Sequence, residues 1–139
     1  MDSHDTPRQL LVVEDNPTDT ILLKRALSEH GVNYEMIVLE DGEEAVEYLD
    51  KDEGAREPDL IIVDLNLPKL DGIEVLKRYR SSSRFAETPV AILTSSDSPS
   101  ERRRAENIGI NAYLRKPIEL DAFLALGATL RSLLETSAK

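Results

Sequence analysis

Carboxylate side chains directly follow two of the most apolar segments of the chain. The segment 10–13, Leu-Leu-Val-Val, ends in Glu14 and Asp15, and the segment 60–63, Leu-Ile-Ile-Val, ends in Asp64. Short apolar runs rich in β-branched residues are typical of strands buried on both faces of a sheet. Open α/β folds place their ligand site at the carboxyl edge of such strands, so these three carboxylates are expected to converge there.

Three carboxylates at one sheet edge repel one another, which raises some of their pKa values or requires a bound cation. The chain has no cysteine and only two histidines, so oxygen atoms are the available ligands and Mg²⁺ is the natural cation. Two further strand ends would add the hydroxyl of Thr94 and the ammonium of Lys116. Together these groups suit phosphoryl transfer through an aspartyl-phosphate. The competing interpretation is three unrelated helix caps, although Asn16 already takes the cap position beside Asp15.

The elements that must position these groups alternate between strand and helix along the whole chain. Helices are expected to begin at caps, and their apolar residues fall on one face. Such alternation predicts a parallel sheet with right-handed crossovers and helices on both faces. For five strands the flavodoxin-like order 2-1-3-4-5 is the common solution, so we expect a three-layer (βα)5 sandwich. The expected strands are 10–13, 34–39, 60–63, 90–93 and 112–114, and the expected helix caps are Asn16, Asp41, Asp71 and Ser98.

The last two helices differ in how much apolar surface they offer. The fourth helix, which Gly109 ends, has only Ala105 and Ile108 as clear anchors and carries arginines at 102–104, so it should be the most weakly docked. The final helix, from about 120 to 134, has more leucines than one buried stripe requires. They form either a broad core face or part of a partner surface. Gly127 inside this helix suggests close packing.

Length and composition limit the class of protein. The chain has 139 residues, enough for one domain with a real core, expected over about 8–135 with short flexible ends. With 17 basic and 27 acidic residues the net charge is −10, which argues against a nucleic-acid partner. The charged segment around 50–58 is expected to be a surface loop. No stretch reaches the ~18 apolar residues of a membrane span, and no signal peptide is visible, so cytoplasmic residence is the default.

The motifs resemble those of a response-regulator receiver domain of two-component signalling, over nearly the whole chain. An acidic pair follows the first strand, and Asp64 follows the third. Thr94 comes 94 − 64 = 30 positions later, Tyr113 comes 49 later, and Lys116-Pro117 begins 52 later. The stretches VEDNPTD, DLNLPKLDG, LTSS and YLRKP are similar to the group that serves phytochrome-type histidine kinases.

The resemblance implies a role for each acid at the sheet edge. Asp64 would accept the phosphoryl group from a sensor histidine kinase. Mg²⁺ would be bound by Asp15 directly, by Glu14 through water, by Asp64, and by the backbone carbonyl of Asn66. Asn66 and Ser96 would stand at the positions where the family tunes the lifetime of the phosphate.

The resemblance also implies how the signal is read. Thr94 would hydrogen-bond a phosphoryl oxygen, and Lys116 would pair with it, aimed by a cis Lys116–Pro117 peptide. Tyr113 would be the switch aromatic, or otherwise a half-buried tyrosine on an edge strand. The change would leave through the fourth helix, fifth strand and fifth helix, which could also form a homodimer. The chain would catalyse only its own phosphorylation and slow dephosphorylation, and an unidentified downstream protein or phosphotransfer partner would read its state.

Three other classes compete with this interpretation. A phosphorylation-independent pseudo-receiver would share the fold, but the intact acid set argues against it. A haloacid-dehalogenase-type phosphatase needs Asp-x-Asp after its first strand, whereas the third-strand motif here is Asp64-Leu65-Asn66. A flavin-binding flavodoxin needs a hydroxyl-rich phosphate loop after the first strand, where this chain has acids.

Overall fold

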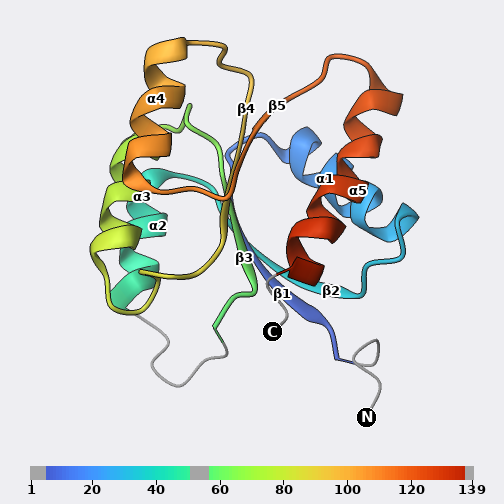
Figure 1. Ribbon diagram of the computed structural model, residues 1–139, viewed down its shortest axis with the longest axis horizontal. Helices are drawn as coiled ribbons and strands as arrows, with labels where there is room; N and C mark the ends of the chain where they lie inside the picture. The colour runs from blue at the N-terminus through green and yellow to red at the C-terminus, as the bar shows by residue number, and fades with distance from the viewer. Residues whose placement is uncertain (1–5, 51–56, 137–139) are drawn as a thin grey trace.

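Five parallel strands form one sheet at the centre of the molecule, and helices cover both of its faces (Figure 1). The computed structural model describes residues 6–50 and 57–136. The strand order is β2-β1-β3-β4-β5, so the predicted flavodoxin-like α/β class is confirmed. The strands are β1 (Arg8–Val13), β2 (Tyr34–Leu39), β3 (Leu60–Val63), β4 (Val90–Thr94) and β5 (Ala112–Arg115).

Helices α1 and α5 lie on one face of the sheet, and α2, α3 and α4 lie on the other (Figure 1). The segments expected to be flexible ends and a charged surface loop include residues 1–5, 51–56 and 137–139, which lie outside the described residues. No helix among the described residues combines the length and apolar character needed to cross a bilayer. The helices are α1 (Pro17–Glu29), α2 (Gly42–Asp50), α3 (Gly72–Ser81), α4 (Pro99–Ile108) and α5 (Leu120–Thr136).

Each central strand supplies side chains to two separate cores. In β1, Leu10 and Val12 pack with residues of α1 and α5, whereas Leu11 and Val13 pack with residues of α2, α3 and α4. Successive side chains of a strand point to opposite faces, so a strand covered on both faces must be apolar at every position. The uninterrupted apolar runs seen in the sequence follow from this requirement.

The strand register places the chemical groups at one level of the sheet. Val13 pairs with Val63, and Val63 pairs with Ile92, so β1, β3 and β4 end close together. The Asp64 amide then donates to the Val13 carbonyl at 3.0 Å, and the Lys116 amide donates to the Thr94 carbonyl at 2.8 Å. Residues that are far apart in the sequence therefore lie side by side where the strands end.

Helix α4 is weakly anchored, as the sequence predicted. Ala105 is its one buried residue, Ile108 is partly buried, and the three arginines at 102–104 are exposed. Its ends are nevertheless tied to neighbouring elements. The Ser98 hydroxyl caps the first turn by accepting from the Glu101 amide, and the Arg80 side chain donates to the Gly109 carbonyl at 2.9 Å.

The leucines of α5 serve a broad core face, one of the two alternatives left open by the sequence. Leu130 and Leu134 are buried, while Leu126 and Leu133 are partly buried against the same core. Gly127 faces α1, and a Cβ atom at this position would overlap the Ala26 carbonyl oxygen. Glycine therefore costs helix propensity here but allows α1 and α5 to approach closely.

Candidate functional site

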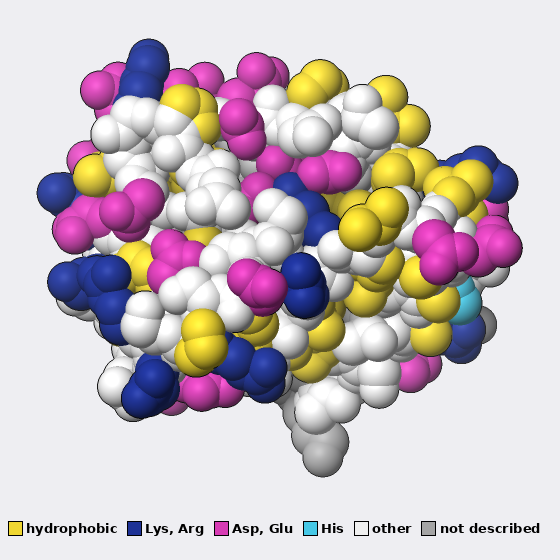
Figure 2. Space-filling view, turned by 90° about the horizontal axis from the view of Figure 1, so that it is seen from above, with side chains coloured by type: hydrophobic (Ala, Val, Ile, Leu, Met, Phe, Trp, Pro, Cys, Tyr) yellow, Lys and Arg dark blue, Asp and Glu magenta, His cyan; other side chains and the backbone are white. Residues whose placement is uncertain are grey.

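The carboxyl edge of the sheet brings together an ammonium group and buried carboxylates. Lys116 Nζ lies 2.7 Å from Glu14 Oε1, 2.7 Å from Asp64 Oδ2 and 2.7 Å from Asp19 Oδ2. Figure 2 looks down on this edge, where acidic side chains gather around basic ones near the middle of the face. The predicted convergence of the strand-end groups is therefore observed, with Asp19 added to them.

Glu14, Asp15 and Asp64 can share a cation. One carboxylate oxygen from each residue lies within 4.8 Å of the others. Glu14 and Asp64 are only 3% and 4% exposed, whereas Asp15 is open to solvent. An all-oxygen set with one exposed member suits Mg²⁺, which binds few protein carboxylates and keeps several of its waters. The donor set therefore fits the predicted metal.

Charge coupling at the site changes the acidity of two groups. Burial raises the pKa of Glu14 to about 7, with repulsion from Asp64 adding to the effect and the hydrogen bond from Lys116 opposing it. Burial alone would lower the pKa of Lys116, but hydrogen bonds to its three carboxylate partners outweigh burial and hold that pKa above its usual value. Lys116 is therefore fully charged, and a cation bound beside Glu14 would displace the proton from Glu14.

Thr94 is fully buried and is linked to Asp64 through Asn66. The Asn66 amide donates to Asp64 Oδ1 at 3.0 Å, and its side-chain Nδ2 lies 3.4 Å from Thr94 Oγ1. Thr94 Oγ1 also accepts from the Ser96 amide at 3.2 Å. A change at Asp64 can therefore reach the β4–α4 loop through one side chain and one hydroxyl.

Tyr113 continues this chain of contacts into α4 and β5. Its side chain is half-buried against the core on the α4 side, and its hydroxyl donates to the Ser96 carbonyl at 3.3 Å. The Ser96 hydroxyl donates to Glu101 of α4, and the Arg102 guanidinium lies 5.2 Å from the centre of the Tyr113 ring. The β4–α4 loop is thus held jointly by β5 and by the first turn of α4.

The backbone at the start of α3 lies in close contact with the backbone of Asp64. The start of α3 packs directly on β3, where the Gly72 amide donates to the Leu65 carbonyl at 3.0 Å. A Cβ atom on Gly72 would overlap the Asp64 carbonyl oxygen. The sequence showed Gly72 only as the start of a helix, whereas its role here is to allow this approach.

One prediction about the site is wrong. The described residues contain no cis peptide bond, so Lys116–Pro117 is trans rather than cis. A trans bond before proline is favoured by about 0.5–1 kcal/mol, and here it already lets Lys116 reach its carboxylate partners.

Sequence reasoning missed Asp19 as a site residue and treated it only as an acid in the first turn of a helix. The place in the first turn is confirmed, because Asn16 caps α1 and Pro17 is its first residue. The available signal was its place one helical turn after Asp15, on a helix that starts at the acidic sheet edge. Asp19 stands in the first turn of this helix, close enough to the strand ends to turn back toward them.

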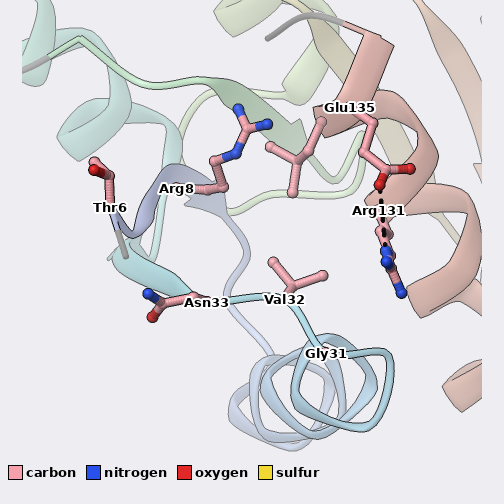
Figure 3. A pocket seen from close by; sticks show the side chains of 8 residues that line it. Thr6, Arg8, Gly31, Val32, Asn33, Arg131 and Glu135 are labelled. Carbon is pink, nitrogen blue, oxygen red and sulfur yellow. Dashed lines mark ion pairs between the residues drawn. The ribbon is translucent and has the colours of Figure 1, made fainter. Parts of the chain in front are cut away.

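Two of the hollows on the surface of the described residues differ in position, and one of them adjoins these groups. A hollow of about 290 Å³ lies beside Glu14 and Asp15, and its other lining residues come from α1, β2 and the residue after it. The other, of about 110 Å³, is lined by Arg8, Asn33 and Arg131 among others (Figure 3). Arg8 begins β1, so this second hollow lies at the opposite edge of the sheet from the acids.

Comparison with known proteins identifies similar sequences. A family model described as "Response regulator receiver domain" matches residues 10–126, a range that includes all the strand-end groups above. FilR2 of Methanothrix harundinacea, described as a probable methanogenesis regulatory protein, is 38% identical over 117 residues, covering 83% of this chain and 76% of FilR2. The response regulator Rcp1 of Synechocystis is 34% identical over 118 residues, covering 83% of this chain and 80% of Rcp1.

Two solved structures resemble this fold closely. Phosphorylated RcpA, described as a cyanobacterial phytochrome response regulator, superposes with a TM-score of 0.87 at 31% identity, covering 96% of this chain and 98% of RcpA. The Mn²⁺-bound form of Rcp1 superposes with a TM-score of 0.82 at 31% identity, covering 91% of this chain and 93% of that one. Fold, motif spacing and sequence similarity thus agree.

Proposed function

Because this chain belongs to the response-regulator receiver domain family of two-component signalling, we propose that it accepts a phosphoryl group on Asp64 from a sensor histidine kinase, with Mg²⁺ as cofactor. The observation that carries the proposal is the position of Asp64. One of its oxygens faces the ammonium of Lys116, and a carboxylate oxygen lies within reach of Glu14 and Asp15. The chain is a signalling domain, and the reaction proposed for it modifies its own Asp64 carboxylate.

Phosphoryl transfer forms one bond as it breaks another. An Asp64 carboxylate oxygen attacks the phosphorus, and the bond from phosphorus to the donor histidine nitrogen breaks with its electron pair going to the imidazole. Glu14, Asp15, Asp64 and the Asn66 carbonyl would hold Mg²⁺. The ion supplies positive charge that stabilises the phosphoryl oxygens in the transition state.

Lys116 and Thr94 would then bind the charge of the product. Phosphorylation adds close to two negative charges beside Asp64. Lys116 Nζ is already 2.7 Å from Asp64 Oδ2, and the Thr94 hydroxyl is linked to the same residue through Asn66. We propose that Asn66 and Ser96, which frame Thr94, set how long the phosphate lasts.

Wild-type protein incubated with acetyl phosphate and Mg²⁺ is expected to gain the mass of one phosphoryl group. The acid set requires a divalent cation to relieve repulsion from the incoming phosphate, so EDTA should prevent the gain. Intact mass spectrometry measures both conditions, and a parallel sample with Ca²⁺ tests the preference for a small cation. A mass unchanged under all conditions would instead support a phosphorylation-independent interaction module.

The kinase that serves this chain is proposed from its relatives. RcpA is described as a phytochrome response regulator, and it resembles this chain over nearly the full length of both. We propose a phytochrome-type histidine kinase as the donor on that basis. The downstream protein or phosphotransfer partner would read the phosphorylation state through α4, β5 and α5. The Tyr113 and Ser96 contacts connect β5 and α4 to the site.

The flank of α5 next to β5 offers a surface for a homodimer. Leu126 and Leu133 lie seven positions apart on one side of α5, turned about 100° from Gly127, which faces α1. Ala122 precedes Leu126 by four positions and is exposed. On the opposite flank Arg131 donates to the carbonyl of His30, the residue that follows α1, and the exposed Ala128 lies three positions before Arg131.

Ala122→Glu is expected to prevent dimer formation by the beryllofluoride-loaded protein, because it places a charge in a self-complementary interface. Light scattering should give a dimer for loaded wild type and a monomer for the variant. Ala128→Glu, which adds the same charge on the α1 flank, should dimerise as wild type does. A wild type that stays monomeric with beryllofluoride would exclude the homodimer.

A further inference from the structure

We propose that Asp19 is a positioning residue for Lys116, holding its ammonium in place when Glu14 and Asp64 are engaged by a cation and a phosphoryl group. The inference rests on the proposed phosphoacceptor role of Asp64. It assigns a function to a helix residue that belongs to neither the acid pair after β1 nor the strand ends.

The first observation is the number of partners around Lys116. An ammonium has three hydrogens, and here three carboxylate oxygens lie at 2.7 Å from its nitrogen. The side chains of Lys116 and Asp19 are only 11% and 17% exposed, so solvent screens their pairing little. Asp19 is therefore one of three carboxylates that directly balance the charge of Lys116.

The second observation is that Asp19 is independent of the other two acids. Glu14 and Asp64 belong to the group whose oxygens can share a cation, and Asp19 does not. Asp19 is instead fixed by α1, where the side-chain oxygen of Asn16 accepts from the Asp19 amide at 3.4 Å. When Glu14 and Asp64 take other partners, Asp19 is the carboxylate that can keep Lys116 beside them.

The loss of Asp19 would weaken cation binding in two ways. Lys116 would then be shared by Glu14 and Asp64 alone, so it would compete more strongly for the oxygens that a cation needs. The site would also lose one of its four carboxylates, Glu14, Asp15, Asp19 and Asp64, and with it part of its attraction for Mg²⁺.

Asp19 also stands where an acid stabilises the start of a helix, and this effect must be distinguished from the positioning of Lys116. Acids in the first turn of a helix stabilise it by interacting with the positive end of its dipole. Glu74 provides the matched case, because it is the third residue of α3, as Asp19 is of α1. Glu74 pairs with Arg78 at 3.2 Å on the surface, away from Lys116. A helix-end effect should appear in both positions, and a positioning effect only in Asp19.

The test compares Asp19→Asn, Asp19→Glu and Glu74→Gln in full-length, ¹⁵N-labelled protein. The first measurement needs no metal: the side-chain Nζ–H signal of Lys116, which slow exchange with water makes visible when the ammonium is held in ion pairs. We expect this signal in wild type, Asp19→Glu and Glu74→Gln, and we expect it to weaken in Asp19→Asn, because one of the three ammonium hydrogens then loses its carboxylate partner and exchanges faster.

The second measurement is the Mg²⁺ dissociation constant, followed by backbone amide shifts. Asp19→Asn is expected to weaken Mg²⁺ binding by about threefold to tenfold, since one nearby charge is lost and Lys116 competes more strongly. Asp19→Glu should return it to within about twofold of wild type because the charge is retained. Glu74→Gln should leave it unchanged.

Phosphate uptake from acetyl phosphate, measured on the same samples, distinguishes a failure of the role proposed for Asp19 from a failure of the proposed function. If wild type takes up phosphate and Asp19→Asn keeps both the Lys116 signal and the wild-type Mg²⁺ affinity, the role of Asp19 is overturned and the proposed function stands. If wild type takes up none, both are overturned. A weakened Lys116 signal and a lower Mg²⁺ affinity in Asp19→Asn, with both restored by Asp19→Glu, support the positioning role.

Discussion

Replacing Asp64 with asparagine is expected to abolish phosphate uptake, lowering it by at least about 100-fold, because an amide is no nucleophile and no acyl phosphate can form. The change is nearly isosteric, and the substituted side chain would keep an oxygen for the amide of Asn66, which now donates to Asp64 Oδ1 at 3.0 Å. Intact mass after incubation with acetyl phosphate and Mg²⁺ measures the loss. Hydroxylamine should release the phosphate from wild type, as expected of an acyl phosphate.

Asp15→Asn is the matched control for this prediction. Asp15 is an exposed member of the same acid group, so its substitution removes one charge from the site and leaves Asp64 intact. Uptake should fall but recover as the Mg²⁺ concentration is raised, which cannot happen in Asp64→Asn. A phosphoryl group retained by Asp64→Asn at any Mg²⁺ concentration would place the acceptor on another carboxylate.

The sheet could be predicted from the sequence because it is buried on both faces. Strands β1, β3 and β4 have no polar residue that could face solvent along their apolar runs, so each appeared as an uninterrupted apolar segment. Their alternation with capped helices left few possible topologies. The convergence of Glu14, Asp64, Thr94 and Lys116 then required only that parallel strands end at one edge.

The remaining part of the site depends on helix rotation and side-chain direction, which strand ends do not specify. Asp19 reaches Lys116 only because α1 turns that face toward the sheet edge. The bridge from Asp64 to Thr94 depends on the side chain of Asn66, whereas the sequence assigned Asn66 a backbone carbonyl and a position that tunes lifetime. The contact of Ser96 with Glu101 likewise follows from the path of a loop.

The final helix shows a different limit. A count of its leucines could not distinguish a broad core face from a partner surface, because both need apolar residues on more than one stripe. Packing shows that Leu126 and Leu133 extend the core between α5 and the sheet, and that smaller residues are exposed on the same flank. A test of the partner surface must therefore change Ala122 and leave Leu126 in place.

Thr94→Ala is expected to accept phosphate yet fail to transmit the change. The Thr94 hydroxyl accepts from the Ser96 amide at 3.2 Å, and the Ser96 carbonyl accepts from the Tyr113 hydroxyl at 3.3 Å. Without the hydroxyl, an added charge on Asp64 has no direct link to this loop, although Lys116 and the acid group remain. We therefore expect uptake within about threefold of wild type, because the hydroxyl binds the product's charge rather than activating Asp64.

The signal itself is measured by amide NMR spectra with and without beryllofluoride. In wild type, residues 98–135 should shift, since Ala105 is the one buried residue of α4 and few buried side chains oppose its movement. In Thr94→Ala these shifts should be lost, while those beside Asp64 persist. Thr94→Ser keeps the hydroxyl and should restore them, which separates loss of the hydrogen bond from loss of packing. Equal shifts in wild type and Thr94→Ala would mean that Lys116 alone carries the change to β5, because it is the other group that bonds both Asp64 and the Thr94 carbonyl.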